Sequence, residues 1–369
     1  MKVALVRRES RPHGGVERVT ARVAAELVKA GLEVALVAHR WDDVPPGVRF
    51  QRVPLPPGPK SVRTLAFALG APRVARSHGT IVHSFDRLVS QDLYRVGEGV
   101  HREWLLRRRR HFPRHETLLD PIKPLHRVIL AIERRAFGGG ARLLVPNSHM
   151  VAGEIHRHYR PAAPAHVVRT GVDLDHFHPD RRAALRPATR RELGLGDETV
   201  FLFIGSGFRR KGLALLLAAL ARVRGVVRLL VIGGDRAGPY RRLAETLGMA
   251  DRVRFLGVVD DPLAAYAAAD VFILPSLYDP AANTCLEAMA LGLPVVTTRA
   301  NGSGELIESD RTGCLIEDPT DAAAFAAGLA PLLDPRERVA VGARARAAVE
   351  AFPWSRHIDE VLGLYARLR

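Results

Sequence analysis

The sequence has no long uninterrupted run of apolar residues. A membrane-spanning helix needs about 18 of them, and the longest apolar region, 212–220, is shorter and runs into Arg222. A signal-peptide pattern is missing as well, because the apolar run at the amino terminus is short and Arg7 and Arg8 follow it directly. We therefore expect a cytoplasmic protein.

Cysteines and metal-binding patterns are also scarce. The two cysteines, Cys285 and Cys314, each lie among apolar residues, which favours buried thiols over a disulfide or a metal pair. The HxxxH spacing within 149–158 lacks further ligands, and no DxD pair follows a strand. We therefore expect no metal ion and no cofactor.

Basic residues, by contrast, are in excess. Lys and Arg number 55 against 39 Asp and Glu, a net charge of +16, and the most basic run is 101–115. The excess indicates an anionic partner, although an arginine-rich composition alone gives the same charge. Aromatic residues make up only 6% and do not interleave with the basic run, which disfavours nucleic acid. The run suits acidic lipid head groups better, so we expect peripheral attachment to the inner face of the cell membrane.

Apolar periodicity predicts two successive α/β halves. In the first, strands at 2–6 and 32–38 flank a helix with apolar residues at helical spacing over 16–28, and further strands are expected at 79–85 and 142–146. From residue 199 the alternation restarts, with strands expected at 200–205, 228–233, 253–257, 271–275 and 294–298, and helices at about 212–223, 238–247, 261–268 and 283–291. Strands that alternate with helices form parallel, doubly wound sheets.

The length of the chain agrees with two domains, because 369 residues exceed what one ordinary core supports. The polar, turn-rich segment 167–179 suits an interdomain crossing. We predict an amino-terminal domain over 1–175 and a carboxyl-terminal domain over 176–350. The last segment, 351–369, would cross back to the first domain as a helix.

The first candidate site is the turn after strand 2–6, where Gly14 and Gly15 follow His13. Glycines let the backbone approach a phosphate, and the start of a helix supplies N–H groups. A plain strand-to-helix turn explains the same residues. The pattern is also not the GxGxxG fingerprint of dinucleotide-binding proteins.

The second candidate site is GSGFRRKG at 205–212, between a predicted strand and a helix. Gly205 allows a tight turn, and Arg210 and Lys211 would stand at the carboxyl edge of the sheet, where ligands of open α/β sheets bind. A guanidinium beside an ammonium suits a diphosphate. A solvated basic helix start is the alternative, but cations oppose the dipole at a helix N-terminus, and a bound anion would offset that.

The third candidate site is YDPAANTCLE at 278–287. Asp279 would lie in the loop, and Glu287 in an otherwise apolar helix, where a buried carboxylate needs a hydrogen-bonded partner. Vicinal ribose hydroxyls would serve, and so would an arginine. The residues around the helix start would present N–H groups to a phosphate: Ala281, Ala282, Asn283 and Thr284.

The fourth set of candidates lies in the first half of the chain and comprises His83, Asp86 and Asp92. His83 falls at the predicted carboxyl end of a strand, where sites of α/β sheets gather. A lone histidine is more often structural, and the same holds for Asp92.

Together these segments resemble glycosyltransferase family 4, whose fold is GT-B, and within it the lipopolysaccharide core glucosyltransferase I group. The resemblance nearly spans the chain, in family order, through HGGVER at 13–18, PNSHMVAGEI at 146–155, TGVDLDHFHP at 170–179, GSGFRRKG at 205–212 and LYDPAANTCLEAMALGLPVVTT at 277–298. It implies two Rossmann-like domains facing across a cleft. It also implies a retaining, metal-independent transfer of glucose from UDP-glucose to a lipopolysaccharide core or related cell-envelope glycolipid.

The resemblance also implies roles for single residues. Gly15 and nearby amides would face the diphosphate, Arg210 and Lys211 would bind it, and the amides around 281–284 would complete the phosphate site. Glu287 would hold the ribose. Asp279 would lie beside the donor sugar, and Asp92 matches an acidic position that faces the acceptor or the donor sugar; with His83 they are the catalytic candidates.

One position departs from the family pattern, because the E-x7-E motif here begins with Asp279. The shorter carboxylate loses about one methylene of reach, so the class of donor is better supported than the sugar it carries. A nucleotide-sugar 2-epimerase with the same fold remains an alternative function, and a nucleic-acid-binding protein is another.

Overall fold

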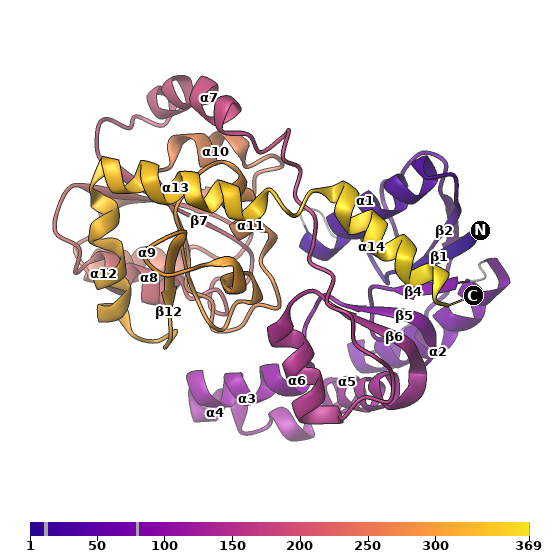
Figure 1. The fold of residues 1–369 in the computed structure, drawn as a ribbon. Coiled ribbons are helices and arrows are strands. Elements are labelled where there is room, and N and C mark those ends of the chain that lie inside the picture. Colours follow the sequence, from indigo (N-terminus) through magenta and orange to yellow (C-terminus); the bar gives the residue numbers. More distant parts are fainter. Residues whose placement is uncertain (11–13, 79–80, 369) are drawn as a thin grey trace. The chain divides into compact units, whose positions relative to one another are not determined.

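The computed structural model describes residues 1–10, 14–78 and 81–368. The chain divides into two units, Met1–Thr170 with Ser355–Arg369 as unit 1 and Gly171–Trp354 as unit 2. Each unit contains one six-stranded sheet with helices packed around it (Figure 1).

The sheet of unit 1 has the strand order β3-β2-β1-β4-β5-β6, with every pair of neighbours parallel. Its order reverses between β1 and β4, and ligands of such sheets bind beyond the carboxyl ends of the strands at that point. The strands are β1 (Lys2–Val6), β2 (Glu33–Ala38), β3 (Arg49–Arg52), β4 (Ile81–Ser84), β5 (Gln91–Val96) and β6 (Ala141–Pro146). The helices are α1 (Gly15–Lys29), α2 (Lys60–His78), α3 (His101–His111), α4 (Arg114–Thr117), η1 (Asp120–Ile122), α5 (Pro124–Arg135), η2 (Ala136–Gly140), α6 (His149–Tyr159) and α14 (Trp354–Ala366).

The sheet of unit 2 repeats this topology in the order β12-β11-β10-β7-β8-β9, again all parallel, and reverses between β7 and β10. Its strands are β7 (Thr199–Ile204), β8 (Val227–Ile232), β9 (Val253–Gly257), β10 (Val271–Leu274), β11 (Val295–Thr298) and β12 (Gly313–Ile316). Its helices are α7 (Pro179–Glu192), α8 (Leu213–Leu220), α9 (Gly238–Thr246), η3 (Ala250–Arg252), α10 (Leu263–Ala268), α11 (Asn283–Ala290), η4 (Gly302–Leu306), α12 (Ala322–Leu329), η5 (Pro331–Leu333) and α13 (Pro335–Val349).

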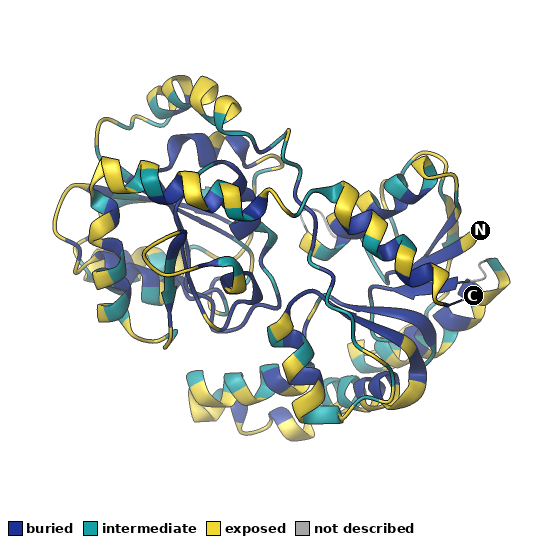
Figure 2. Cartoon of the chain, viewed as in Figure 1, coloured by how far each residue is buried: buried dark blue, intermediate teal, exposed yellow. Residues whose placement is uncertain are grey.

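The central strands are largely apolar because helices cover both faces of each sheet. All four residues of β10 are 0% exposed. The strands β1 and β7 are buried over nearly all their residues (Figure 2). The prediction of two doubly wound parallel sheets is therefore confirmed.

Several local features differ from the sequence expectation. The strands β3, β5 and β12 were not predicted, and the first two residues of the strand expected at 79–85 lie outside the described residues. Both cysteines are free thiols, but only Cys285 is buried, whereas Cys314 is partly exposed. Within the described ranges, no helix is long and apolar enough to cross a membrane.

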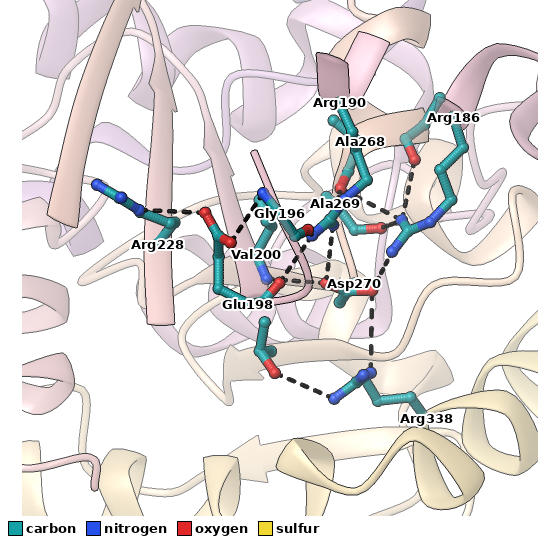
Figure 3. A network of polar contacts seen from close by, with 12 residues as sticks. Arg186, Arg190, Gly196, Glu198, Val200, Arg228, Ala268, Ala269, Asp270 and Arg338 are labelled. Atoms are coloured by element: carbon teal, nitrogen blue, oxygen red, sulfur yellow. Dashed lines mark hydrogen bonds and ion pairs between the residues drawn. The ribbon is translucent and has the colours of Figure 1, made fainter. Parts of the chain in front are cut away.

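The amino edge of the unit 2 sheet is tied to α7 by charged side chains (Figure 3). Arg186 donates hydrogen bonds to the carbonyl oxygens of residues 267–269, at the end of α10, and to Asp270 at 2.7 Å. Asp270 also accepts from the Val200 N–H of β7 at 2.8 Å. A cation at a helix C-terminus is favourable, so this network fixes α7 against the sheet.

Candidate functional site

The candidate site of unit 2 lies at the carboxyl edge of its sheet, where the strand order reverses. The segment 205–212 follows β7, and the segment 275–282 follows β10 and leads into α11. Arg210 O accepts a hydrogen bond from Leu277 N–H at 2.8 Å, which joins the two segments. Gly212 has a φ of +79°, and a Cβ there would lie 2.0 Å from Pro275 O, so only glycine allows this close approach.

Arg210, Lys211 and Asp279 form one charged cluster in this site. The Arg210 guanidinium donates to Asp279 Oδ2 at 3.2 Å and to Tyr278 O at 2.7 Å, and the Lys211 ammonium donates to the same Asp279 oxygen. Lys211 is 8% exposed and Asp279 5%. Burial raises the pKa of Asp279, but Lys211 and Arg210 more than counter it, so the net pKa lies below the ordinary 3.8. The site thus brings together three residues that were singled out from the sequence, and both cations donate to the same carboxylate.

The loop before α11 is held by residues that follow β11. Asp279 N–H donates to Ala300 O at 2.8 Å, and Ala282 N–H donates to Asn301 Oδ1 at 3.2 Å. The Ser303 hydroxyl donates to Ala282 O at 2.9 Å. Asn301 and Ser303 were not identified from the sequence. They lie in a polar, glycine-containing segment that follows a predicted strand at the same sheet edge, and this position was the signal by which they could have been identified.

The start of α11 lies where the sequence placed it. Ala282 precedes the helix without a side-chain cap, and Asn283 and Thr284 form its first residues, both partly exposed. Backbone N–H groups at such a helix start can bind a phosphate. Among the described residues, the buried hydroxyl of Thr284 has no hydrogen-bond partner.

Glu287 is 7% exposed on α11 and accepts a hydrogen bond from the Tyr266 hydroxyl at 3.0 Å. The same hydroxyl oxygen of Tyr266, on α10, lies 3.0 Å from Thr284 O, so this side chain connects α10 to the first turn of α11. The need for a hydrogen-bonded partner was expected from the sequence, but Tyr266 itself was not identified, because nothing in a single sequence relates it to α11.

In unit 1, the glycines of the first candidate site begin α1. Gly14 precedes the helix and Gly15 is its exposed first residue, whereas His13 lies outside the described residues. A Cβ at Gly14 would lie 2.1 Å from a Glu17 carboxylate oxygen, and Glu17 pairs with Arg7 at 3.0 Å. The glycine therefore makes room for this ion pair, and a role toward a diphosphate stays a prediction.

The remaining unit 1 candidates are not brought together. His83 is 1% exposed, its Nδ1 lies 2.6 Å from the Tyr365 hydroxyl of α14, and burial and then Arg95 hold its pKa well below 6.5. It is a neutral side chain in the interior. Asp86 accepts from Arg8 N–H at 2.7 Å, in the loop after β4.

Asp92 lies near the amino end of β5. His83 of β4 pairs with Leu93 of β5. Because successive side chains of a strand point to opposite faces, Asp92 lies on the opposite face of the sheet from His83. Its carboxylate accepts from Val82 N–H at 2.9 Å and lies 3.5 Å from Arg76. Ligands of these sheets bind at the other edge. These contacts hold the Asp92 carboxylate in the interior of unit 1, and its expected catalytic role stays a prediction.

Comparisons with known proteins cover most of the chain. The family described as Glycosyltransferase Family 4 matches residues 13–176, and the family Glycosyl transferases group 1 matches residues 198–335. A D-inositol 3-phosphate glycosyltransferase of Geodermatophilus obscurus is 36% identical over 242 residues, 60% of this chain and 52% of that protein. The chain thus spans about half the length of the inositol phosphate glycosyltransferases that it matches.

The lipopolysaccharide glucosyltransferase WaaG of Escherichia coli K12 is 25% identical over 318 residues, 84% of this chain and 83% of that protein. The crystal structure of WaaG, a glycosyltransferase involved in lipopolysaccharide biosynthesis, matches with a TM-score of 0.84 at 24% identity, over 97% of this chain and 98% of that chain.

Proposed function

Because the chain belongs to glycosyltransferase family 4 and has the GT-B fold of two Rossmann-like units, we propose that it transfers a hexose from a nucleotide diphosphate sugar to an anionic cell-envelope glycolipid. The observation that carries this proposal is the placement of Arg210 and Lys211 on the segment 205–212, from here on called the donor turn, next to the loop that leads into α11. Two cations and a helix start at a switch point suit a diphosphate.

In the proposed donor complex, each part of the site has one task. Arg210 and Lys211 bind the diphosphate, together with N–H groups at the start of α11, and no divalent ion is needed to neutralise it. Glu287, oriented by Tyr266, accepts hydrogen bonds from the ribose hydroxyls. Asp279 faces the donor sugar.

The proposed reaction retains the configuration of the sugar. The bond between the anomeric carbon and the oxygen of the β-phosphate breaks, and the acceptor hydroxyl forms its bond to the same face of that carbon. The acceptor proton passes to the departing phosphate oxygen. Arg210 and Lys211 stabilise the negative charge that develops on the leaving diphosphate, and this is their catalytic contribution.

We propose UDP-glucose as the donor, in line with the glucosyltransferase name of WaaG. A lipopolysaccharide core or a related glycolipid is the proposed acceptor, which the amino-terminal unit would bind. We place the protein in the cytoplasm, on the inner face of the membrane.

The membrane part of the proposal rests on a short stretch of unit 1. Large apolar side chains are 51% to 75% exposed there, on α3, η1 and the segment between them: Leu106, Leu118, Leu119 and Ile122. Arg109 and Arg110 are exposed in the same stretch, whereas Arg107 and Arg108 are paired with carboxylates of their own unit. Apolar side chains among cations suit the boundary of an acidic membrane.

The experiment that tests the donor assignment measures release of nucleoside diphosphate from UDP-glucose, ADP-glucose and GDP-mannose with a lipopolysaccharide-core acceptor. Glu287→Ala is expected to lose most activity, while Glu245→Gln, an exposed carboxylate on α9, keeps it. Full activity of Glu287→Ala would remove Glu287 from the site. Turnover of the donor without any acceptor would indicate an epimerase.

A further inference from the structure

The donor turn is held by carboxylates on two sides. Asp279 accepts from Arg210 and Lys211 near its end, as described above. At its beginning, Asp235 accepts from the N–H groups of Gly207 and of Phe208, the latter at 2.9 Å. Asp235 comes from the loop after β8, and neither the sequence pattern nor the proposed function gave it a role.

Asp235 reaches the turn because the two loops pack closely. A Cβ at Gly233 would lie 2.4 Å from Gly205 O and from the Phe208 ring, so the absence of a side chain there brings the loop after β8 against the turn. Phe208 is 2% exposed and fixes this part of the turn in the core. Asp235 itself is exposed to solvent. A ligand that accepts from the same N–H groups of the turn would therefore meet this carboxylate.

The groups that bind these carboxylates are of the same kind as those that bind phosphate oxygens. Backbone N–H groups, a guanidinium and an ammonium all prefer an oxyanion, and a carboxylate is one. The turn carries three positive charges, Arg209, Arg210 and Lys211, and the two carboxylates bring two negative charges to it. The protein itself therefore neutralises most of the positive charge of the turn.

We propose that Asp235 is a residue of the donor site that competes with the diphosphate for the donor turn, and so weakens the binding of the nucleoside diphosphate product. This inference rests on the proposed function, because it takes the donor turn as the diphosphate site. The negative charge of Asp235 repels the diphosphate, and its carboxylate takes two N–H groups that a phosphate oxygen would accept from. The consequence is faster release of the product after each transfer.

The test is titration calorimetry of the full chain with UDP, ADP and GDP, on the wild type and on Asp235→Asn. Asparagine keeps the shape and one accepting oxygen but removes the charge. We expect Asp235→Asn to bind the preferred nucleoside diphosphate about three- to tenfold more tightly at low salt, with a smaller difference at high salt. Glu245→Gln, which removes a charge from the same unit away from the turn, is the matched control.

A second variant separates charge from capping. Asp235→Ser keeps a short oxygen that can accept from the turn, and it should also bind the diphosphate more tightly than the control. If both variants only lower the thermal unfolding midpoint and bind no more tightly than Glu245→Gln, Asp235 is merely a cap of the turn and the inference is overturned.

The proposed function fails in a different way. If no nucleoside diphosphate binds to the wild type or to either variant, or if Arg210→Ala binds as tightly as the wild type, the donor turn is not the diphosphate site, and both proposals fall. If binding depends on Arg210 but not on the charge of Asp235, the donor site stands and only the role of Asp235 is lost.

Discussion

At the scale of single residues, Glu287 shows how a buried carboxylate is tolerated. It lies on an apolar helix at 7% exposure, and Tyr266 donates a hydrogen bond to it from α10. A hydrogen bond to a charged group contributes about 1.5 to 3 kcal/mol. The same bond orients the carboxylate, so Tyr266 is a positioning residue for the ribose in the proposed complex.

Removing that hydroxyl should therefore act on donor binding. Tyr266→Phe is expected to raise the KM for the nucleotide sugar about tenfold while kcat changes little, because the ribose contact is made equally in the ground and transition states. Initial rates over a range of donor concentrations measure this. Tyr159→Phe removes a comparable bond, to Glu133 in unit 1, and should leave the KM unchanged. An unchanged KM in Tyr266→Phe would separate Tyr266 from the donor site.

His357, on α14, gives unit 1 a predicted sensitivity to acid. Burial and, to a smaller extent, Arg95 lower its pKa, and a hydrogen bond with Arg169 O raises it, so that the net pKa is about 3. The unfolded chain has a histidine pKa near 6.5. Between about pH 6.5 and 3 the unfolded state binds one more proton than the folded state at this residue, so the stability that is full above pH 6.5 is lost as the pH falls.

The size of this loss is about 1.4 kcal/mol per pH unit for one such group. His357→Gln should flatten the pH dependence of unit 1 unfolding by that amount between pH 6 and 4. The measurement is the free energy of unfolding of unit 1 in urea at each pH, with hydrogen exchange of α14 as the readout. Parallel pH profiles for the wild type and the variant would show that His357 is protonated in the fold.

At the scale of elements, α7 depends on the network around Asp270. This carboxylate, 7% exposed, accepts from Arg186 and from Val200 N–H. Asp270→Asn is expected to destabilise unit 2 by about 2 kcal/mol, because arginine loses its charged acceptor. Denaturant unfolding measures the change. The ion pair of Arg346 with the exposed Glu350 provides the control, since Glu350→Gln should cost less than about 0.5 kcal/mol. Equal effects of the two substitutions would contradict the account.

The stretch from α3 to η1 carries the proposed membrane contact. Arg109→Gln with Arg110→Gln should weaken binding to acidic vesicles roughly 30-fold, at about 1 kcal/mol for each cation near the surface. Leu118→Ser with Leu119→Ser should weaken it as well. Co-sedimentation with phosphatidylglycerol vesicles measures both, and the exposed pair Arg222 and Arg224 of unit 2, changed to Gln, is the matched control. Equal sedimentation of all variants would remove the membrane role.

The strands that could be predicted from the sequence are those whose apolar pattern is formed by neighbouring residues. The run VFIL of β10 is wholly apolar, and the donor turn follows β7 directly, so both could be read from neighbouring residues. The strand β5 could not, because buried Gln91, Asp92 and Arg95 interrupt it. Some of their polar groups bond to distant partners, as when Arg95 donates to the Thr170 hydroxyl at 2.7 Å.

The same limit applies to the candidate site. Arg210, Lys211 and Glu287 stand out in the sequence because their charge conflicts with their local surroundings. Asn301 and Asp235 do not, because polar residues in loops are ordinary. Only the parallel order of the strands brings them to the same sheet edge.

At the scale of the whole molecule, two units with the same strand order differ in the charge at their switch points. In unit 1, Arg7 after β1 has three carboxylates around it, Glu17 at 3.0 Å, Asp86 at 3.6 Å and Glu98 at 2.7 Å. In unit 2, two cations share one carboxylate, Asp279. An excess of carboxylates repels a diphosphate, so the electrostatics favour unit 2 as the donor unit.

The central claim is that a nucleotide diphosphate sugar binds to unit 2 at the donor turn and at the start of α11. Hydrogen–deuterium exchange of the full chain, with and without saturating UDP-glucose or UDP, tests it most directly. The account predicts slower exchange in peptides covering 205–213 and 279–291, with the amino edge of the same sheet unchanged. Binding that leaves both of these segments unprotected would contradict it.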